Sequence, residues 1–112
     1  MKDLSIVILQ LRDGRAKTRT TAARTLSEHS SPLARKDLLR CLNDSDDEVR
    51  YWATVALAEL SDEKLTGRIA AQLDDPATQV RMVAAKVLAK RPYRGAVQNL
   101  LRSLGDPDEN VA

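Results

Sequence analysis

The sequence predicts an all-α fold, a solenoid of stacked helix–turn–helix units, on the strength of three observations. Four segments of the 112-residue chain repeat at a spacing of 31 residues, and a period of about 20–50 residues is typical of such arrays. Within the segments, apolar residues recur every three or four positions, and no stretch alternates as a strand would. Aromatic residues make up only 3% of the chain and Phe is absent, so Ala, Leu and Val must fill the interior, which suits closely packed helices.

The 31-residue register is defined by a leucine and, two residues later, an aspartate. These pairs are Leu11 and Asp13, Leu42 and Asp44, Leu73 and Asp75, and Leu104 and Asp106. We therefore expect a single domain over residues 1–112, with repeats at about 1–31, 32–62 and 63–93 and a truncated repeat at 94–112. The expected helices span residues 2–12, 15–29, 32–43, 46–60, 63–73, 77–90 and 94–104.

The second repeat shows why each unit should hold two helices. Pro32 suits the first turn of a helix, where its missing N–H is not needed, and apolar residues at helical spacing follow it. The polar residues 43–45 interrupt that helix. Asp44 is expected to cap the second helix, whose first turn is acidic, as the helix dipole favours. From Val49 to Leu60 the helical apolar spacing returns, which predicts a second amphipathic helix.

The other repeats follow the same rule, with two departures. In the third and fourth repeats, Asp75-Pro76 and Asp106-Pro107 mark the start of the second helix. The first repeat has Thr18 where the later repeats have valine, so its second helix should pack less well. The fourth repeat stops at Ala112, where an arginine belongs, and lacks its second helix. We therefore expect the chain to be cut from, or docked onto, something longer.

An arginine follows each of the first three aspartates by six residues, at Arg19, Arg50 and Arg81. Because the arginine always occurs with the aspartate, we expect a structural ladder. In this ladder each guanidinium group bonds an aspartate or the loop carbonyls of its own or a neighbouring repeat. The alternative is a row of arginines that binds phosphate groups.

The segments Leu42–Leu57 (LNDSDDEVRYWATVAL) and Leu73–Leu88 (LDDPATQVRMVAAKVL) resemble the HEAT-like repeat, of the short type first recognised in phycobilisome lyases. The resemblance covers essentially the whole chain. It implies a right-handed α-α superhelix of about three and a half repeats, with the second helix of each repeat lining the concave face. It does not imply one function, because such repeats occur in scaffolds, adaptors, lyase subunits and DNA-repair proteins.

If the resemblance holds for this chain, the second helices would form a partner-binding surface on the concave face. Exposed Tyr, Trp and Met ringed by charge are typical of hot spots in protein interfaces. Tyr51 should be exposed, whereas the spacing from Val49 also allows Trp52 to lie in the core. The expected partner-binding residues are Thr20, Arg24, Tyr51, Trp52, Val55, Glu59, Met82, Val83, Lys86 and Lys90.

Both ends of the chain carry apolar residues at unusual places. Ile6 and Leu9 stand where the second repeat has Asp37 and Arg40, on the convex side. The first helix of the fourth repeat has lost the helix that should cover its apolar residues, among them Val97, Leu100 and Leu101. We therefore expect one end to contact a second copy of the chain or further sequence of a longer parent.

Composition favours a non-catalytic protein-interaction module, a scaffold or adaptor. The net charge of +2 argues neither for nor against a polyanionic partner. However, an acidic second repeat separates two basic ones, which suits a protein partner of mixed charge more than a continuous track for nucleic acid. Nucleic-acid binding stays open as an alternative, through Arg12, Arg15, Lys17, Arg19 and Arg24 of the first repeat with Lys86 and Lys90 of the third. A second alternative, a subunit of a lyase-type enzyme, follows from the resemblance alone. No catalytic, metal-binding or cofactor-binding motif is present, so we expect no cofactor.

The single cysteine indicates the compartment. Cys41 lies in an apolar helical stretch and cannot form an intramolecular disulfide, so a buried thiol in the reducing cytoplasm is expected. No stretch approaches the roughly 20 apolar residues of a membrane span, and we expect no membrane partner.

Overall fold

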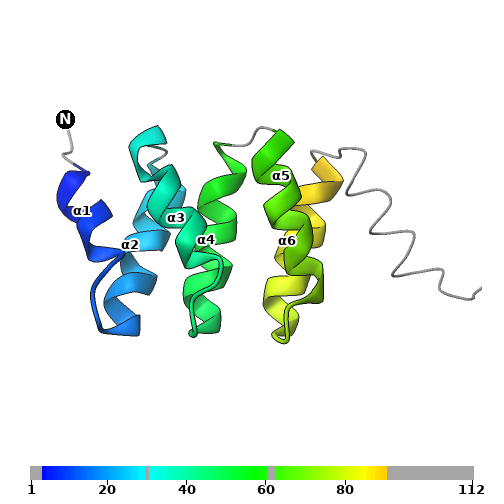
Figure 1. Ribbon diagram of the computed structural model, residues 1–112, viewed down its shortest axis with the longest axis horizontal. Coiled ribbons are helices and arrows are strands. Elements are labelled where there is room, and N and C mark those ends of the chain that lie inside the picture. Colours follow the sequence, from blue (N-terminus) through cyan, green and yellow to red (C-terminus); the bar gives the residue numbers. More distant parts are fainter. Residues whose placement is uncertain (1–3, 30, 61–62, 91–112) are drawn as a thin grey trace, which may run out of the picture.

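The computed structural model describes residues 4–29, 31–60 and 63–90, and every element in these residues is a helix. The α-helices are α1 (Ser5–Gln10), α2 (Ala16–Glu28), α3 (Arg35–Cys41), α4 (Asp47–Ala58), α5 (Glu63–Ala70) and α6 (Thr78–Lys90), with short 3₁₀ helices η1 (Pro32–Ala34) and η2 (Ala71–Asp74). The helices form three pairs that stand side by side along one axis (Figure 1). The predicted all-α solenoid is confirmed. The helix expected over residues 94–104 lies outside the described residues.

The first helices of the pairs are less regular than the sequence predicts. The segment expected as one helix over 32–43 begins with η1, in which Pro32 occupies the first turn, and continues as α3. The segment expected over 63–73 ends in η2. A tightening of a terminal turn to 3₁₀ geometry is common at helix ends, and apolar spacing does not distinguish the two geometries.

Asp46, and not Asp44, caps the second helix of the middle pair. The carboxylate of Asp46 accepts the N–H groups of Glu48 at 2.9 Å and Val49 at 3.3 Å. Asp44 lies two residues upstream and closes the turn, because its Oδ1 accepts the N–H of Asp46 at 2.9 Å. The prediction that Asp44 caps α4 is therefore wrong. Three aspartates within four residues offer equivalent capping groups, so composition alone cannot choose among them.

The second helices form the closer-packed layer of the stack. α2 packs against α4 and α4 against α6, whereas neighbouring first helices approach one another little. A curved stack shows this difference between its concave and convex sides. The core lies between the two layers, where Val49, Ala53 and Leu57 of α4 have no exposed surface. Thr18 is half-buried where Val49 and Val80 are fully buried, so the first repeat does pack less well at this position.

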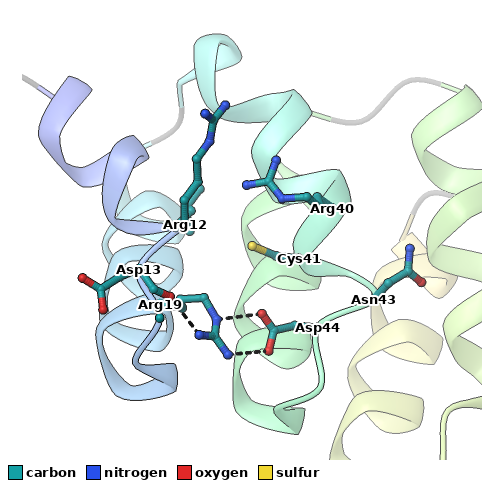
Figure 2. A pocket seen from close by; sticks show the side chains of 9 residues that line it. Arg12, Asp13, Arg19, Arg40, Cys41, Asn43 and Asp44 are labelled. Atoms are coloured by element: carbon teal, nitrogen blue, oxygen red, sulfur yellow. Dashed lines mark hydrogen bonds and ion pairs between the residues drawn. The ribbon is translucent and has the colours of Figure 1, made fainter.

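The predicted ladder of aspartates and arginines is confirmed, and it connects successive repeats. Arg19 donates from Nε and Nη2 to the two carboxylate oxygens of Asp44, at 2.8 and 3.0 Å. Arg50 makes the same two bonds to Asp75, at 2.8 and 3.0 Å. In each case the third nitrogen, Nη1, donates to the main-chain oxygen of the aspartate in the arginine's own repeat: Asp13 at 2.8 Å for Arg19 and Asp44 at 2.7 Å for Arg50. Figure 2 shows the bonds of Arg19.

Each aspartate of the ladder also fixes its own turn. Asp44 accepts the N–H of Asp46, and Asp75 accepts that of Ala77, both at 2.9 Å. Burial of these carboxylates by itself raises their pKa values, but the bonds from arginine and from the main chain outweigh it and lower the pKa of both. Both carboxylates are therefore charged at neutral pH. Arg81 bonds the loop carbonyls of Asp75 at 2.7 Å and Pro76 at 3.1 Å, so it shares with Arg19 and Arg50 the bond to the main-chain oxygen of its own repeat's aspartate.

In the described residues, no helix combines the length and the apolar character that crossing a membrane requires.

The ladder predicts a measurable difference between a buried and an exposed arginine. Arg50→Ala should lower the free energy of unfolding by about 1–3 kcal/mol, because it leaves the buried carboxylate of Asp75 without its charged partner. Arg15 is the matched control, since its bond to Asp13 is made at the surface, with 78% of the arginine side chain exposed. Urea unfolding of both variants measures the difference, and an equal loss in the two would contradict the structural role of the ladder.

Candidate functional site

A groove of about 630 Å³ lies between α4 and α6 on the second-helix face. Trp52, Val55 and Ala58 of α4 form one wall, and Met82, Val83 and Val87 of α6 form the other. Trp52, Val55 and Ala58 are three residues apart and Val83 and Val87 four, so each set lies on one side of its helix. A mostly apolar, partly enclosed groove of this volume is typical of binding sites.

Charged and polar residues surround the apolar groove. Glu59 and Lys90 lie at one end, where α4 and α6 finish, Lys86 lies one turn before Lys90, and all three are exposed. Gln79 lies toward the other end, where its Nε2 donates to Asp47 Oδ2 at 3.1 Å and so connects α6 with α4. Apolar walls within a polar rim are the arrangement found in protein interfaces.

The structure brings eight of the ten expected partner-binding residues to this groove. They are Tyr51, Trp52, Val55, Glu59, Met82, Val83, Lys86 and Lys90. Thr20 and Arg24 lie on α2 and do not line it, although Arg24 contacts Trp52. Sequence reasoning missed Ala58, Gln79 and Val87, which also line the groove. Extending the helical spacing by one turn from Val55 and Val83 would have found Ala58 and Val87.

Two of the expected groove residues are less exposed than predicted. Tyr51 is half-buried and not substantially exposed, so that expectation is wrong. Its ring packs edge-on against that of Trp52, with ring centroids 5.0 Å apart and an interplanar angle of 85°. Val83 is only 9% exposed, whereas its neighbour Met82 is 67% exposed. Met82 is therefore the large apolar side chain that the groove presents most openly.

Trp52 belongs both to the core and to the groove. It is partly buried and packs against the core cluster, while another part of its surface lines the groove. The guanidinium carbon of Arg24 lies 5.3 Å from the centroid of the Trp52 ring, a distance at which a cation is attracted to the ring. The sequence left open whether Trp52 lies in the core or on the binding surface, and different parts of its side chain do both.

A second cavity, of about 770 Å³, lies beside the loops between α1 and α2 and between α3 and α4 (Figure 2). Most of its charged groups already bond other residues. Arg19 is held by Asp44, and Arg12 and Arg40 both donate to Oδ1 of Asp37, at 3.0 and 2.9 Å. Cys41 also lines the cavity, but its burial raises the pKa of the thiol to about 11, so it stays protonated at neutral pH. The expectation of a buried thiol is confirmed, and the cavity presents no activated nucleophile.

Most basic residues of the first repeat are engaged within the chain. Arg12 bonds Asp37, Arg15 bonds Asp13, Arg19 bonds Asp44 and Arg24 lies over Trp52. Of the five basic residues that the nucleic-acid alternative would use in this repeat, these four already have a partner. The repeat therefore offers less positive charge to a phosphate backbone than its composition indicates.

The apolar positions on α1 face outward. Ile6 and Leu9 are 65% and 63% exposed, as the sequence predicts for the convex side. Asp37, which occupies the position of Ile6 in the second repeat, is instead buried between Arg12 and Arg40. Val97, Leu100 and Leu101 lie outside the described residues.

Three stacked helix–turn–helix pairs, connected by a repeating ladder and carrying a groove on one layer, define the chain as an α-solenoid repeat protein. The family model for HEAT repeats matches residues 4–69, which is more than half of the chain. The protein therefore belongs to the HEAT-repeat family. Proteins of the family generally mediate protein–protein interactions or serve as scaffolds.

Comparison with solved structures supports the fold. The chain resembles the crystal structure of an engineered protein, with a TM-score of 0.63 and 23% sequence identity. The match covers 92% of this chain and 51% of that protein, so the chain spans about half its length. A search of curated protein sequences found no match.

The two roles of Trp52 predict different stabilities for neighbouring groove variants. Trp52→Ala should lower the free energy of unfolding by about 1.5–3 kcal/mol, because the part of the ring that packs against the core is lost. Met82→Ala should change it by less than about 0.5 kcal/mol, because Met82 is mostly exposed. Thermal unfolding of the two variants is the measurement, and a Trp52→Ala protein as stable as Met82→Ala would show that Trp52 is not part of the core.

Proposed function

We propose that the protein is a non-catalytic interaction module, a scaffold or adaptor that binds a partner protein through its second-helix face. The observation that carries the proposal is the groove between α4 and α6. Its apolar walls, with Trp52 and Val83 largely buried and Met82 openly presented, have the composition of protein-binding hot spots. The charged rim would exclude water around these contacts once a partner is in place.

Several further observations support binding rather than catalysis. The charged groups that line the second cavity already bond other residues of the chain, and the thiol of Cys41 has a raised pKa. A catalytic site requires the opposite arrangement, in which a nucleophile is activated by a neighbouring base. The buried, unpaired thiol of Cys41 also supports a cytoplasmic location, because free thiols persist in a reducing compartment.

A pull-down from an extract of the source organism tests the binding face. Met82→Glu places a charge in the groove at an exposed position, so it should abolish the capture of partners while the melting temperature stays within a few degrees. Leu33→Glu is the matched control, because Leu33 is 84% exposed on η1 and does not line the groove. Capture that survives Met82→Glu but is lost with Leu33→Glu would place the binding surface elsewhere.

We also propose a second contact, through the convex face of α1. Ile6 and Leu9 lie one turn apart and are both largely exposed, and covering each of them would contribute up to about 1.5–3 kcal/mol. A second copy of the chain or the sequence of a longer parent would supply the cover. Either occupant would bury both side chains together, since they share one side of the helix.

Sedimentation equilibrium at micromolar concentration tests the case of a second copy. The protein should associate, and the double variant Ile6→Ser/Leu9→Ser should be monomeric under the same conditions. A wild-type protein that stays monomeric, with its helical circular dichroism intact, would contradict self-association through α1.

A further inference from the structure

The charges on the rim of the groove identify the kind of segment that the groove fits. Lys86 and Lys90 are exposed one turn apart on α6, on the same side of that helix. Glu59, the C-cap residue of α4, is exposed on the other wall of the groove. Among the described residues, none of these three side chains forms a salt bridge with another. The groove therefore has a positive wall and a negative wall whose charges are available to a ligand.

The walls themselves favour a helical ligand. Both walls are helices, and the backbone N–H and C=O groups in the interior of a helix already bond one another. An extended peptide in the groove would find no backbone partners, whereas a helical peptide satisfies its own backbone. α4 and α6 run alongside each other in the stack (Figure 1), so a helical ligand could lie over the surface groove that their side chains form.

The length of the groove sets the length of the segment. The lining residues run from Tyr51 to Glu59 on α4 and from Gln79 to Lys90 on α6. At a rise of 1.5 Å per residue these spans correspond to about 12 and 16 Å, or two to three helical turns. A ligand of about three turns, with an apolar stripe at helical spacing, would cover Trp52 and Val83.

We propose that the groove binds a short amphipathic helix of a partner protein, whose flank facing α6 is acidic and whose flank facing Glu59 is basic or neutral. The inference rests on the proposed function, and it adds the class of partner and its orientation about the helix axis. Carboxylates one turn apart on the ligand would pair with Lys86 and Lys90, and the same carboxylates placed toward α4 would meet Glu59. The apolar stripe supplies affinity, and the rim charges select which flank faces which wall.

A peptide selection with a charge-reversed variant tests the inference. The library consists of displayed helical peptides about four turns long, with a constant apolar stripe and flanking positions randomised among Glu, Gln and Lys. On the wild-type protein, selected peptides should carry Glu on one flank. On the double variant Lys86→Glu/Lys90→Glu, the same flank should carry Lys.

Fluorescence supplies the affinities, because Trp52 is the only tryptophan of the chain and lies in the groove. At low salt, a Glu-flanked peptide should bind the wild type about tenfold more tightly than its Lys-flanked counterpart, and the preference should reverse in the double variant. Both variant positions are exposed, so circular dichroism should show an intact fold.

The possible contrary results separate the inference from the function on which it rests. Peptides that bind the groove without a flank preference would overturn the inference and leave the proposed function standing. A second contrary result is that the wild type binds an oligonucleotide and none of the peptides, and that the double variant fails to bind that oligonucleotide. This result would overturn the inference in favour of nucleic acid. If every peptide binds the Met82→Glu variant as well as it binds the wild type, the groove is not the protein-binding surface. That result would contradict the proposed function too.

Discussion

The bond between an arginine of one repeat and the aspartate of the next is the interaction on which the arrangement of the stack depends. Arg19 and Asp44, like Arg50 and Asp75, are largely buried and meet through two parallel hydrogen bonds. The paired geometry fixes the orientation of the groups as well as their distance. Because the same aspartate bonds the first N–H of its own turn, the start of each second helix is positioned by the repeat before it. The groove inherits its shape from this constraint, since α4 and α6 begin directly after the two aspartates.

The fold could be predicted from sequence because its main determinants repeat. The spacing of Leu42 and Asp44 from Leu73 and Asp75 gives the unit, and the apolar spacing within it gives two helices. The existence of the ladder was predictable, since arginine and aspartate recur together. The repeat to which each arginine reaches was not. Spacing cannot show that Arg19 reaches forward to Asp44, 25 residues ahead, while it bonds only the main-chain oxygen of Asp13. That preference depends on where the next loop lies in space.

The sequence predicted which face of the solenoid holds the candidate site, but not how exposed each of its side chains is. Its members follow from helical spacing and from the layer to which the second helices belong. The half-buried state of Tyr51 does not, since its ring packs edge-on against that of Trp52, and helical spacing does not give such side-chain geometry. The sequence also could not show which of several neighbouring aspartates caps a helix, and in α4 the cap is Asp46. Buried polar groups are a related case: Gln72 donates to the main-chain oxygen of Leu42 across a repeat boundary, and no periodicity marks it.

The first aspartate of the ladder gives the array a polarity. Asp13 bonds Arg15 of its own loop through both carboxylate oxygens, in the place where Asp44 and Asp75 receive an arginine of the preceding repeat. Later repeats have Asp46 and Ala77 at the position of Arg15, so this substitute donor is specific to the first. If another repeat were joined ahead of Asp13, its arginine would have to displace Arg15 from the Asp13 carboxylate. Arg15 thus competes locally for the first ladder aspartate, and an engineer who wished to extend the array at this end would begin by replacing it.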